Sequence, residues 1–127
     1  MPKPLRLLAI AGSLCRDSFN RKLLKTLVRG AEEAGAGVDV IDLREFSLPV
    51  YHAEIEAAGM PPAVHALQAR LAPCEGLLIA TPEYNGSMPA LVQNTLDWMS
   101  QAQPDGKSGT ARFAARDAAR GRSAVCR

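Results

Sequence analysis

Short apolar runs alternate with longer segments of helical period along the first hundred residues, and this alternation most restricts the folds open to the chain. Residues 5–11 form a nearly continuous apolar run that ends at Gly12. Residues 76–81 form a similar run, and Val38, Val40, Ile41 and Leu43 make up another short apolar segment. Short, nearly continuous apolar runs are typical of strands buried on both faces of a parallel sheet. We therefore expect three such strands.

Amphipathic segments lie between these runs. Residues 19–34 carry apolar residues on one side and charged residues on the other, and Ser18 is a candidate N-cap. Residues 61–71 and 89–99 begin with proline and continue with helical period. Residues 44–59 read as an irregular surface segment. Strands that alternate with helices predict an α/β fold, a parallel sheet with right-handed crossovers and helices on its faces.

Length and composition fit one soluble domain. The chain has 127 residues, of which 47% are apolar and 22% charged. No apolar run approaches the roughly 20 residues that cross a bilayer, and the start lacks a secretory signal. We therefore expect a cytoplasmic protein that does not associate with membranes. Three cysteines without a CxxC spacing and two histidines predict neither a disulfide framework nor a metal site.

The basic excess of the chain lies near its C-terminus. Residues 1–100 hold nine Lys/Arg and eleven Asp/Glu, a net charge of −2, whereas residues 101–127 hold six and two, a net charge of +4. A nucleic-acid-binding face needs clustered Lys/Arg on folded elements, so we expect no nucleic-acid partner. The two parts also differ in pattern, because residues 101–127 repeat Ala-Arg clusters without an apolar strand.

The first loop with potential chemistry follows the first predicted strand. Residues 12–20 are rich in hydroxyl and amide side chains and lead directly into a helix. Free backbone N–H groups and the helix dipole at such a position favour an anion. The loop matches neither a dinucleotide fingerprint nor a nucleoside-triphosphate loop, and its neutral donors suit a monoester phosphate. Equally, Ser18 could simply cap the helix and Gly12 simply turn the chain.

The second loop follows the third predicted strand. Residues 81–89 contain two prolines and a glycine, which stiffen the backbone where main-chain groups could meet a planar ligand. An ordinary turn would explain Asn85-Gly86 as well. In a sheet of flavodoxin-like order 2-1-3, however, the first and third strands are neighbours, and ligands bind at the crevice between their carboxyl ends. A phosphate on the first loop and a flat ring on the second describe flavin mononucleotide, FMN.

The sequence resembles the NADPH-dependent FMN reductases of the flavodoxin-like superfamily, which include chromate reductases, quinone reductases and azoreductases. The resemblance rests on residues 12–24 (GSLCRDSFNRKLL), residues 80–90 (ATPEYNGSMPA) and residues 94–98 (NTLDW). It covers about residues 4–100 in the order and spacing of the family. The implied fold is a flavodoxin-like doubly wound parallel sheet of order 2-1-3.

The resemblance also implies the ligand contacts. The residues implied for the FMN phosphate are Ser13, Ser18 and Asn20, with Arg16 beside them. Those implied for the border of the flavin ring, largely through backbone groups, are Pro82, Glu83, Tyr84, Asn85, Gly86 and Ser87. No side chain is expected to act as a catalytic acid or base, because hydride transfer takes place on the flavin. Glu83 is assigned a positional role.

The resemblance implies an NAD(P)H-dependent FMN oxidoreductase that forms a homodimer or homotetramer. Its electron acceptor would be a quinone, an azo compound, a free flavin or an oxidised metal ion. Family members are longer and continue into a fourth strand and a Gly-rich loop beside the flavin. Residues 1–100 would therefore be the front part of an FMN-binding domain truncated after the third strand and its helix. We hypothesise that the basic tail, residues 101–127, is disordered, out of frame or otherwise aberrant.

Two alternatives remain open from the residues themselves. The chain could be an inactive flavin-binding remnant that lacks the C-terminal half of the fold. It could also be a small nucleotide-binding module without redox activity. Binding of FMN and oxidation of NADPH would separate these possibilities from the enzyme.

Overall fold

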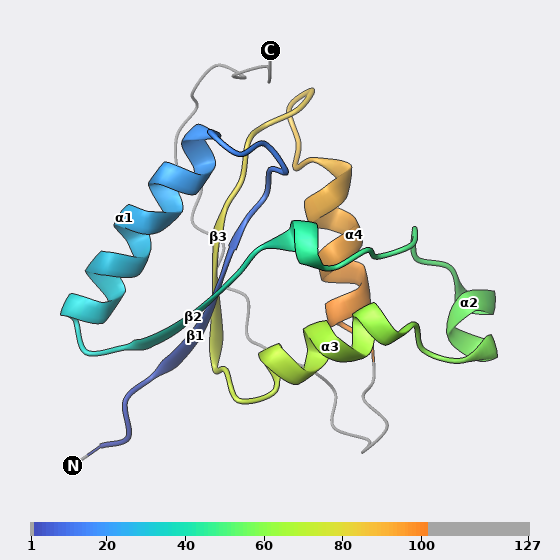
Figure 1. The fold of residues 1–127 in the computed structure, drawn as a ribbon, viewed down its shortest axis with the longest axis horizontal. Coiled ribbons are helices and arrows are strands. Elements are labelled where there is room, and N and C mark those ends of the chain that lie inside the picture. The colour runs from blue at the N-terminus through green and yellow to red at the C-terminus, as the bar shows by residue number, and fades with distance from the viewer. Residues whose placement is uncertain (1, 102–127) are drawn as a thin grey trace.

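The computed structural model describes residues 2–101, which form a three-stranded parallel sheet with helices on both faces (Figure 1). The strands are β1 (Arg6–Ala11), β2 (Gly37–Ile41) and β3 (Gly76–Ala80), and their order is β2-β1-β3. Both neighbouring pairs are parallel. The predicted sheet type and the 2-1-3 order are therefore confirmed.

Three longer helices cover this sheet. Helix α1 (Phe19–Glu33) lies on one face, and α3 (Pro62–Leu71) and α4 (Ala90–Met99) lie on the other (Figure 1). All three correspond to predicted helical segments. The Ser18 side chain accepts a hydrogen bond from the backbone N–H of Arg21, which confirms Ser18 as the N-cap of α1.

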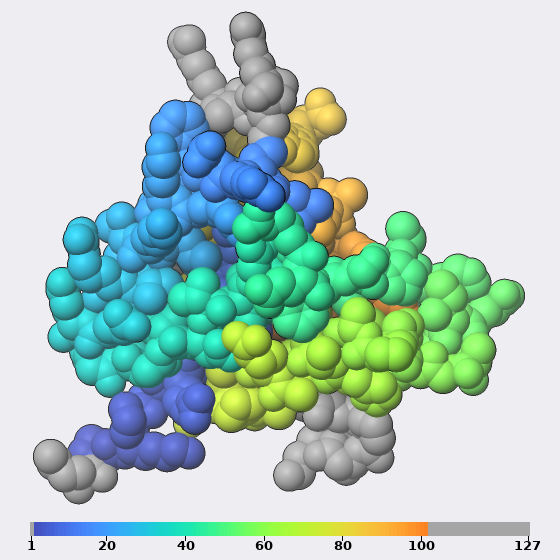
Figure 2. Space-filling view, viewed as in Figure 1, coloured from blue at the N-terminus to red at the C-terminus, as the bar shows by residue number. Residues whose placement is uncertain are grey.

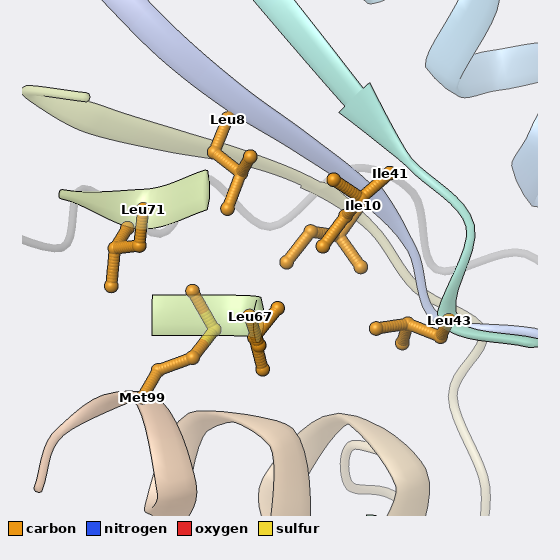
Figure 3. Close-up of a cluster of buried hydrophobic side chains, with 7 residues drawn as sticks. All are labelled: Leu8, Ile10, Ile41, Leu43, Leu67, Leu71 and Met99. Carbon is orange, nitrogen blue, oxygen red and sulfur yellow. The ribbon is translucent and has the colours of Figure 1, made fainter. Parts of the chain in front are cut away.

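The central strand β1 distributes its side chains between two hydrophobic cores. Leu8 and Ile10 point to the face of α3 and α4, where they belong to a cluster with Leu67 and Met99 (Figure 3). The alternate residues Ala9 and Ala11 point to α1 and pack in a second cluster. This two-residue alternation follows from the pleat of a strand. It explains why the run reads as continuously apolar, since both faces of β1 are buried.

The segment between β2 and α3 differs from the prediction in two places. Strand β2 ends at Ile41, because Asp42 caps a short 3₁₀ helix η1 (Leu43–Glu45). The prediction that Leu43 continues the strand is therefore wrong. The predicted irregular segment also contains a short helix, α2 (Ala53–Ala58), which buries none of its residues. Helix α2 projects from the rest of the molecule (Figures 1 and 2).

Helix α4 holds the irregular segment in place. The backbone carbonyl of Pro49 accepts hydrogen bonds from Asn94 Nδ2 at 2.9 Å and from Trp98 Nε1 at 2.7 Å. Asn94 Oδ1 in turn accepts one from the backbone N–H of Tyr51 at 2.8 Å. Trp98 is fully buried and meets the Tyr51 ring edge to face. Trp98 is therefore a core residue that ties a loop to the helix.

Within residues 2–101, no helix combines the length and the hydropathy that crossing a bilayer requires. The predicted basic tail lies outside the described residues.

Candidate functional site

Two loops meet at the carboxyl ends of β1 and β3. The first, residues 12–18, joins β1 to α1, and the second, residues 81–89, joins β3 to α4. Because β1 and β3 are neighbours in the sheet, both loops emerge at the same edge (Figure 1). The backbone N–H of Gly12 donates to the carbonyl of Ala80 at 2.7 Å, so the loops are joined where they leave the sheet. Ligands of doubly wound folds bind at such an edge.

The first loop is packed tightly against the second at Gly12. A Cβ atom at this position would lie 2.6 Å from Val92 Cγ2 of α4 and 2.9 Å from Thr81 Cβ. Only a residue without a side chain can pass there unless its neighbours move. The requirement for glycine therefore comes from close approach between β1, the second loop and α4, and it fixes the position of the first loop.

The hydroxyl groups of the first loop are oriented by backbone hydrogen bonds. Ser13 is 8% exposed, and its Oγ accepts from the backbone N–H of Cys15 at 3.3 Å. Ser18 Oγ accepts from the backbone N–H of Arg21 at 3.1 Å. A hydroxyl that accepts in this way keeps its own proton to donate. Both serines can therefore cap their local backbone and still donate to an anion, so the two roles do not exclude one another.

Further donors lie at the start of α1. Within residues 2–101, the backbone N–H groups of Phe19 and Asn20 have no hydrogen-bond acceptor. The Asn20 side chain is half-buried and makes no hydrogen bond in the same part of the chain. Free N–H groups in a first helical turn, with the positive end of the helix dipole, form a favourable environment for an anion.

Arg16 occupies a different environment from the serines. Its side chain is exposed, and among the described residues no hydrogen bond or ion pair joins it to Ser13 or Ser18. The predicted neutral donors Ser13, Ser18 and Asn20 are thus buried or half-buried, whereas Arg16 is exposed.

The second loop forms a tight hairpin. Tyr84 and Ser87 exchange two backbone hydrogen bonds of 2.9 and 3.1 Å, and the residues between them, Asn85 and Gly86, have φ angles of 53° and 78°. Two consecutive positive φ angles define a type I′ turn, for which Asn-Gly is the preferred pair. The ordinary-turn explanation of Asn85-Gly86 is therefore correct for the backbone, and the same turn supplies the stiffness that a ligand platform needs.

The predicted ring-binding residues lie on the outside of this hairpin. The half-buried residue is Pro82, and the exposed ones are Glu83, Tyr84, Asn85, Gly86 and Ser87. Thr81 Oγ1 donates to the carbonyl of Pro82 at 3.0 Å and closes the start of the loop. The peptide groups at the tip remain available to a ligand.

Large apolar side chains are exposed in and beside both loops. The exposed fraction is 50% for Leu14, 69% for Phe19, 43% for Tyr84 and 42% for Met88. Of these, sequence reasoning singled out only Tyr84. The signal was the presence of apolar residues inside otherwise polar loops, because such residues normally face a core or a ligand. Their exposure gives this edge of the sheet apolar surface beside the anion-binding donors.

A charged cluster at the end of β2 was also not predicted. Asp42 pairs with Arg21 of α1 and with Arg44 of η1. Hydrogen bonds from Arg44, with a further contribution from Arg21, hold the pKa of Asp42 well below its usual range. The pairing depends on the approach of α1, the end of β2 and η1, so no local sequence pattern predicts it.

Among residues 2–101, no three or more His, Cys, Asp or Glu side chains are grouped so that they could hold a metal ion. His52 caps α2 by accepting from the backbone N–H of Glu54, and His65 is exposed on α3. Cys74, which lies between α3 and β3, is half-buried, and this burial raises the pKa of its thiol.

Comparison with known proteins gives a consistent result. Residues 5–125 match the protein family described as NADPH-dependent FMN reductase. An NAD(P)H-dependent FMN reductase of Pseudomonas aeruginosa is 33% identical over 109 residues, which are 86% of this chain and 57% of that protein. A 2-hydroxy-1,4-benzoquinone reductase of a Burkholderia species is 38% identical over 97 residues, which are 76% of this chain and 51% of that protein.

Solved structures show the same likeness. The flavoenzyme NAD(P)H:acceptor oxidoreductase FerB of Paracoccus denitrificans has a TM-score of 0.65 and 32% sequence identity, over 83% of this chain and 54% of that one. An NAD(P)H:quinone oxidoreductase of Methanothermobacter marburgensis, at 21% identity and a TM-score of 0.64, shares the fold. The chain spans about half the length of the curated relatives that it matches.

Proposed function

The chain belongs to the NADPH-dependent FMN reductase family, and from this membership we propose that it binds FMN and passes electrons from NAD(P)H to a small-molecule acceptor. The observation that carries the proposal is the meeting of the serine-rich loop and the Asn-Gly hairpin at the carboxyl ends of neighbouring strands. This is the edge at which a doubly wound sheet binds its ligand.

The two loops offer groups that suit the phosphate and the flavin ring of FMN. We assign the phosphate to Ser13, Ser18 and Asn20 together with the free N–H groups at the start of α1, with Arg16 at the rim. Neutral hydrogen-bond donors and the positive end of a helix dipole favour the terminal charged group of a phosphate monoester.

We assign the edge of the flavin ring to the hairpin that follows β3. Its tip is held in one conformation by the Tyr84–Ser87 hydrogen bonds, so its peptide groups meet a planar ligand without being ordered first. The residues that contribute are Pro82, Glu83, Tyr84, Asn85, Gly86 and Ser87. Exposed apolar side chains at Leu14 and Met88 supply surface suited to an aromatic system.

Bound FMN would supply the redox chemistry, since a flavin accepts hydride from a nicotinamide and passes electrons onward. The chain's own residues bind and orient. The hairpin holds hydrogen-bonding peptide groups at the ring edge, and the serines hold the phosphate. No described side chain needs to act as a general acid or base, and Glu83 is given a positional role on the exposed hairpin.

Several finer points belong to the same proposal. The similarity to quinone reductases favours a quinone as acceptor, with an azo compound, a free flavin or an oxidised metal ion as further candidates. We further propose a cytoplasmic homodimer or homotetramer with no nucleic-acid partner. Because the chain spans about half the length of its relatives, a flavin-binding protein without reductase activity is the second candidate.

Ligand binding by the purified 127-residue protein tests the proposal. Titration with FMN, followed by the quenching of flavin fluorescence, should show one saturable site, and riboflavin should bind more weakly because it lacks the phosphate. Ser18→Ala should weaken FMN binding and leave riboflavin binding nearly unchanged, whereas the exposed Thr26→Ala on α1 should alter neither. A protein that binds neither flavin would contradict the proposal.

Activity is measured separately from binding. Oxidation of NADPH in the presence of FMN and a quinone supports the reductase. Saturable FMN binding without NADPH oxidation, under conditions in which a longer relative is active, supports the second candidate.

A further inference from the structure

We propose that Asp42 is a positioning residue of the anion-binding loop, because it holds the guanidinium of Arg21 at the end of β2 and so keeps this cation away from the phosphate. This inference rests on the proposed function, in that the anion at the start of α1 is the phosphate of FMN. It adds a role for a charged cluster that lies outside the loops described above.

The geometry of the cluster is that of a clamp. Arg21 Nη2 lies 2.5 Å from Asp42 Oδ2. Arg44 Nη2 lies 2.6 Å from the same oxygen, and Arg44 Nε contacts both oxygens at 3.0 and 3.1 Å. The backbone N–H of Arg44 adds a further hydrogen bond of 3.0 Å to Oδ1. With both oxygens engaged by Arg44, Asp42 has a fixed orientation and offers Arg21 a fixed partner.

Without this partner, Arg21 would be well placed to approach an anion. It is the third residue of α1, and its own backbone N–H donates to Ser18 Oγ. Side chains on a helix lean towards its N-terminus, so an unpaired Arg21 side chain would reach the turn where the free N–H groups lie. The ion pair with Asp42 instead engages the guanidinium at the residue that follows β2 and caps η1.

Of the other charged groups near the loop, Arg16 already belongs to the proposed phosphate site, and Arg44 and Lys22 have other partners. Arg44 is engaged by Asp42, and Lys22 Nζ lies 5.4 Å from the centre of the exposed Phe19 ring. Arg16 and Asp17 are exposed, and neither forms an ion pair within residues 2–101. The pKa of Asp42 lies well below its usual range, so the carboxylate stays charged and the clamp persists at neutral pH.

Three variants test the inference: Asp42→Asn, Arg21→Gln and the double variant. Asparagine keeps an oxygen that can cap Arg44 and removes the charge that holds Arg21. Asp42→Asn should lower the dissociation constant of FMN about three- to fivefold at low salt, as expected for one additional exposed charge contact. The gain should shrink at high salt, because exposed charge pairs are screened. Riboflavin affinity should not change, since riboflavin carries no phosphate.

The double variant separates release of Arg21 from simple removal of a negative charge. If Asp42 acts by holding Arg21, the gain disappears when Arg21→Gln is also present, and the two changes are not additive. An equal gain with and without Arg21 would mean that Asp42 repels the phosphate directly, which overturns the inference.

Arg21→Gln alone provides a test that does not depend on Asp42→Asn folding correctly. This variant should bind FMN as the unmodified protein does, and a marked loss would show that Arg21 already contacts the phosphate. If the unmodified protein binds FMN and Asp42→Asn binds it no more tightly, the inference fails while the proposed function stands. If the unmodified protein binds no FMN, the proposed function fails and the inference with it.

Discussion

At the scale of single residues, Gly12 is the glycine of residues 2–101 at which an added Cβ would come closest to its neighbours. Its Cβ would come within 2.6 Å of Val92 and within 2.9 Å of Thr81, both of which belong to the packed end of the sheet. Gly12→Ala should therefore lower the free energy of unfolding by about 1–3 kcal/mol, the usual cost of overpacking a close contact. Urea denaturation followed by circular dichroism measures this change.

Gly30→Ala is the matched control for Gly12→Ala. Gly30 lies within α1 and has no atom within 4 Å of an added Cβ. Alanine there should raise stability by about 0.5–1 kcal/mol, because it is the better helix former. If both alanine variants shift the urea midpoint in the same direction, steric contact at Gly12 is not the cause.

Single residues differ in how far the sequence predicts their contacts. Ser18 was identified as an N-cap because the capping signal is local, and the structure confirms it. The ion pair between Asp42 and Arg21 was not predicted, and neither were the hydrogen bonds of Asn94 to the backbone of Pro49 and Tyr51. Each depends on segments that meet only in the folded chain. Local signals were therefore sufficient for caps and turns and insufficient for tertiary polar contacts.

At the scale of elements, α4 stabilises the irregular segment before α2 through the side-chain amide of Asn94, which both donates and accepts a hydrogen bond. Asn94→Ala removes the donor to Pro49 and leaves the backbone N–H of Tyr51 without its acceptor. The expected loss of stability is about 1–3 kcal/mol, the cost of an unsatisfied group that is partly buried. Hydrogen exchange with mass spectrometry should show faster exchange in residues 46–58. Gln93→Ala, one residue away and exposed, should leave the exchange of this segment unchanged.

The hairpin after β3 depends on one backbone conformation. Gly86 has a φ of +78° with open space around it, so Gly86→Ala introduces backbone strain without a steric clash. This strain costs about 1 kcal/mol locally. We expect FMN to bind about fivefold more weakly, with little change in the urea midpoint, because the tip is exposed. Gly37→Ala, also in open space but without a positive φ, should not alter FMN affinity, and an equal loss there would contradict the explanation.

The same scale shows why some elements were predicted and others were not. The three strands appear in the sequence as short apolar segments, and α1, α3 and α4 appear as apolar faces of helical period. Helix α2 has six residues and buries none of them, so it has no hydrophobic period to detect. The prediction that the second strand extends to Leu43 was wrong for a related reason. Leu43 is buried, but it belongs to the 3₁₀ helix η1 and not to a strand.

At the scale of the whole molecule, charge pairs join the sheet to the helices on both sides. Asp42 connects the end of β2 to α1, and Asp39 connects the middle of β2 to α3 through Arg70. Arg70 Nε donates to Asp39 Oδ2 at 2.7 Å, and Nη2 contacts the other oxygen. The edge strand is thus tied to both helical layers by carboxylates. Because a carboxylate pairs only while it is ionised, the joining of the layers should depend on pH.

The Asp39–Arg70 pair gives the clearest test of this dependence. The hydrogen bond from Arg70 lowers the pKa of Asp39 below its ordinary value of 3.8, so the folded state binds this proton more weakly than the unfolded state. The stabilisation by the Asp39–Arg70 pair is therefore complete when the pH lies above the ordinary pKa of aspartate. It is lost as the pH falls through the lowered pKa of the folded state. Since the pair is partly exposed, we expect Asp39→Asn to cost only about 0.5–1 kcal/mol at neutral pH. Urea unfolding across the acidic range should show the two proteins converging as the pH falls below about 4. A difference between Asp39→Asn and the unmodified protein that persists at the acidic end would mean that Asp39 stabilises the layers by shape and not by charge.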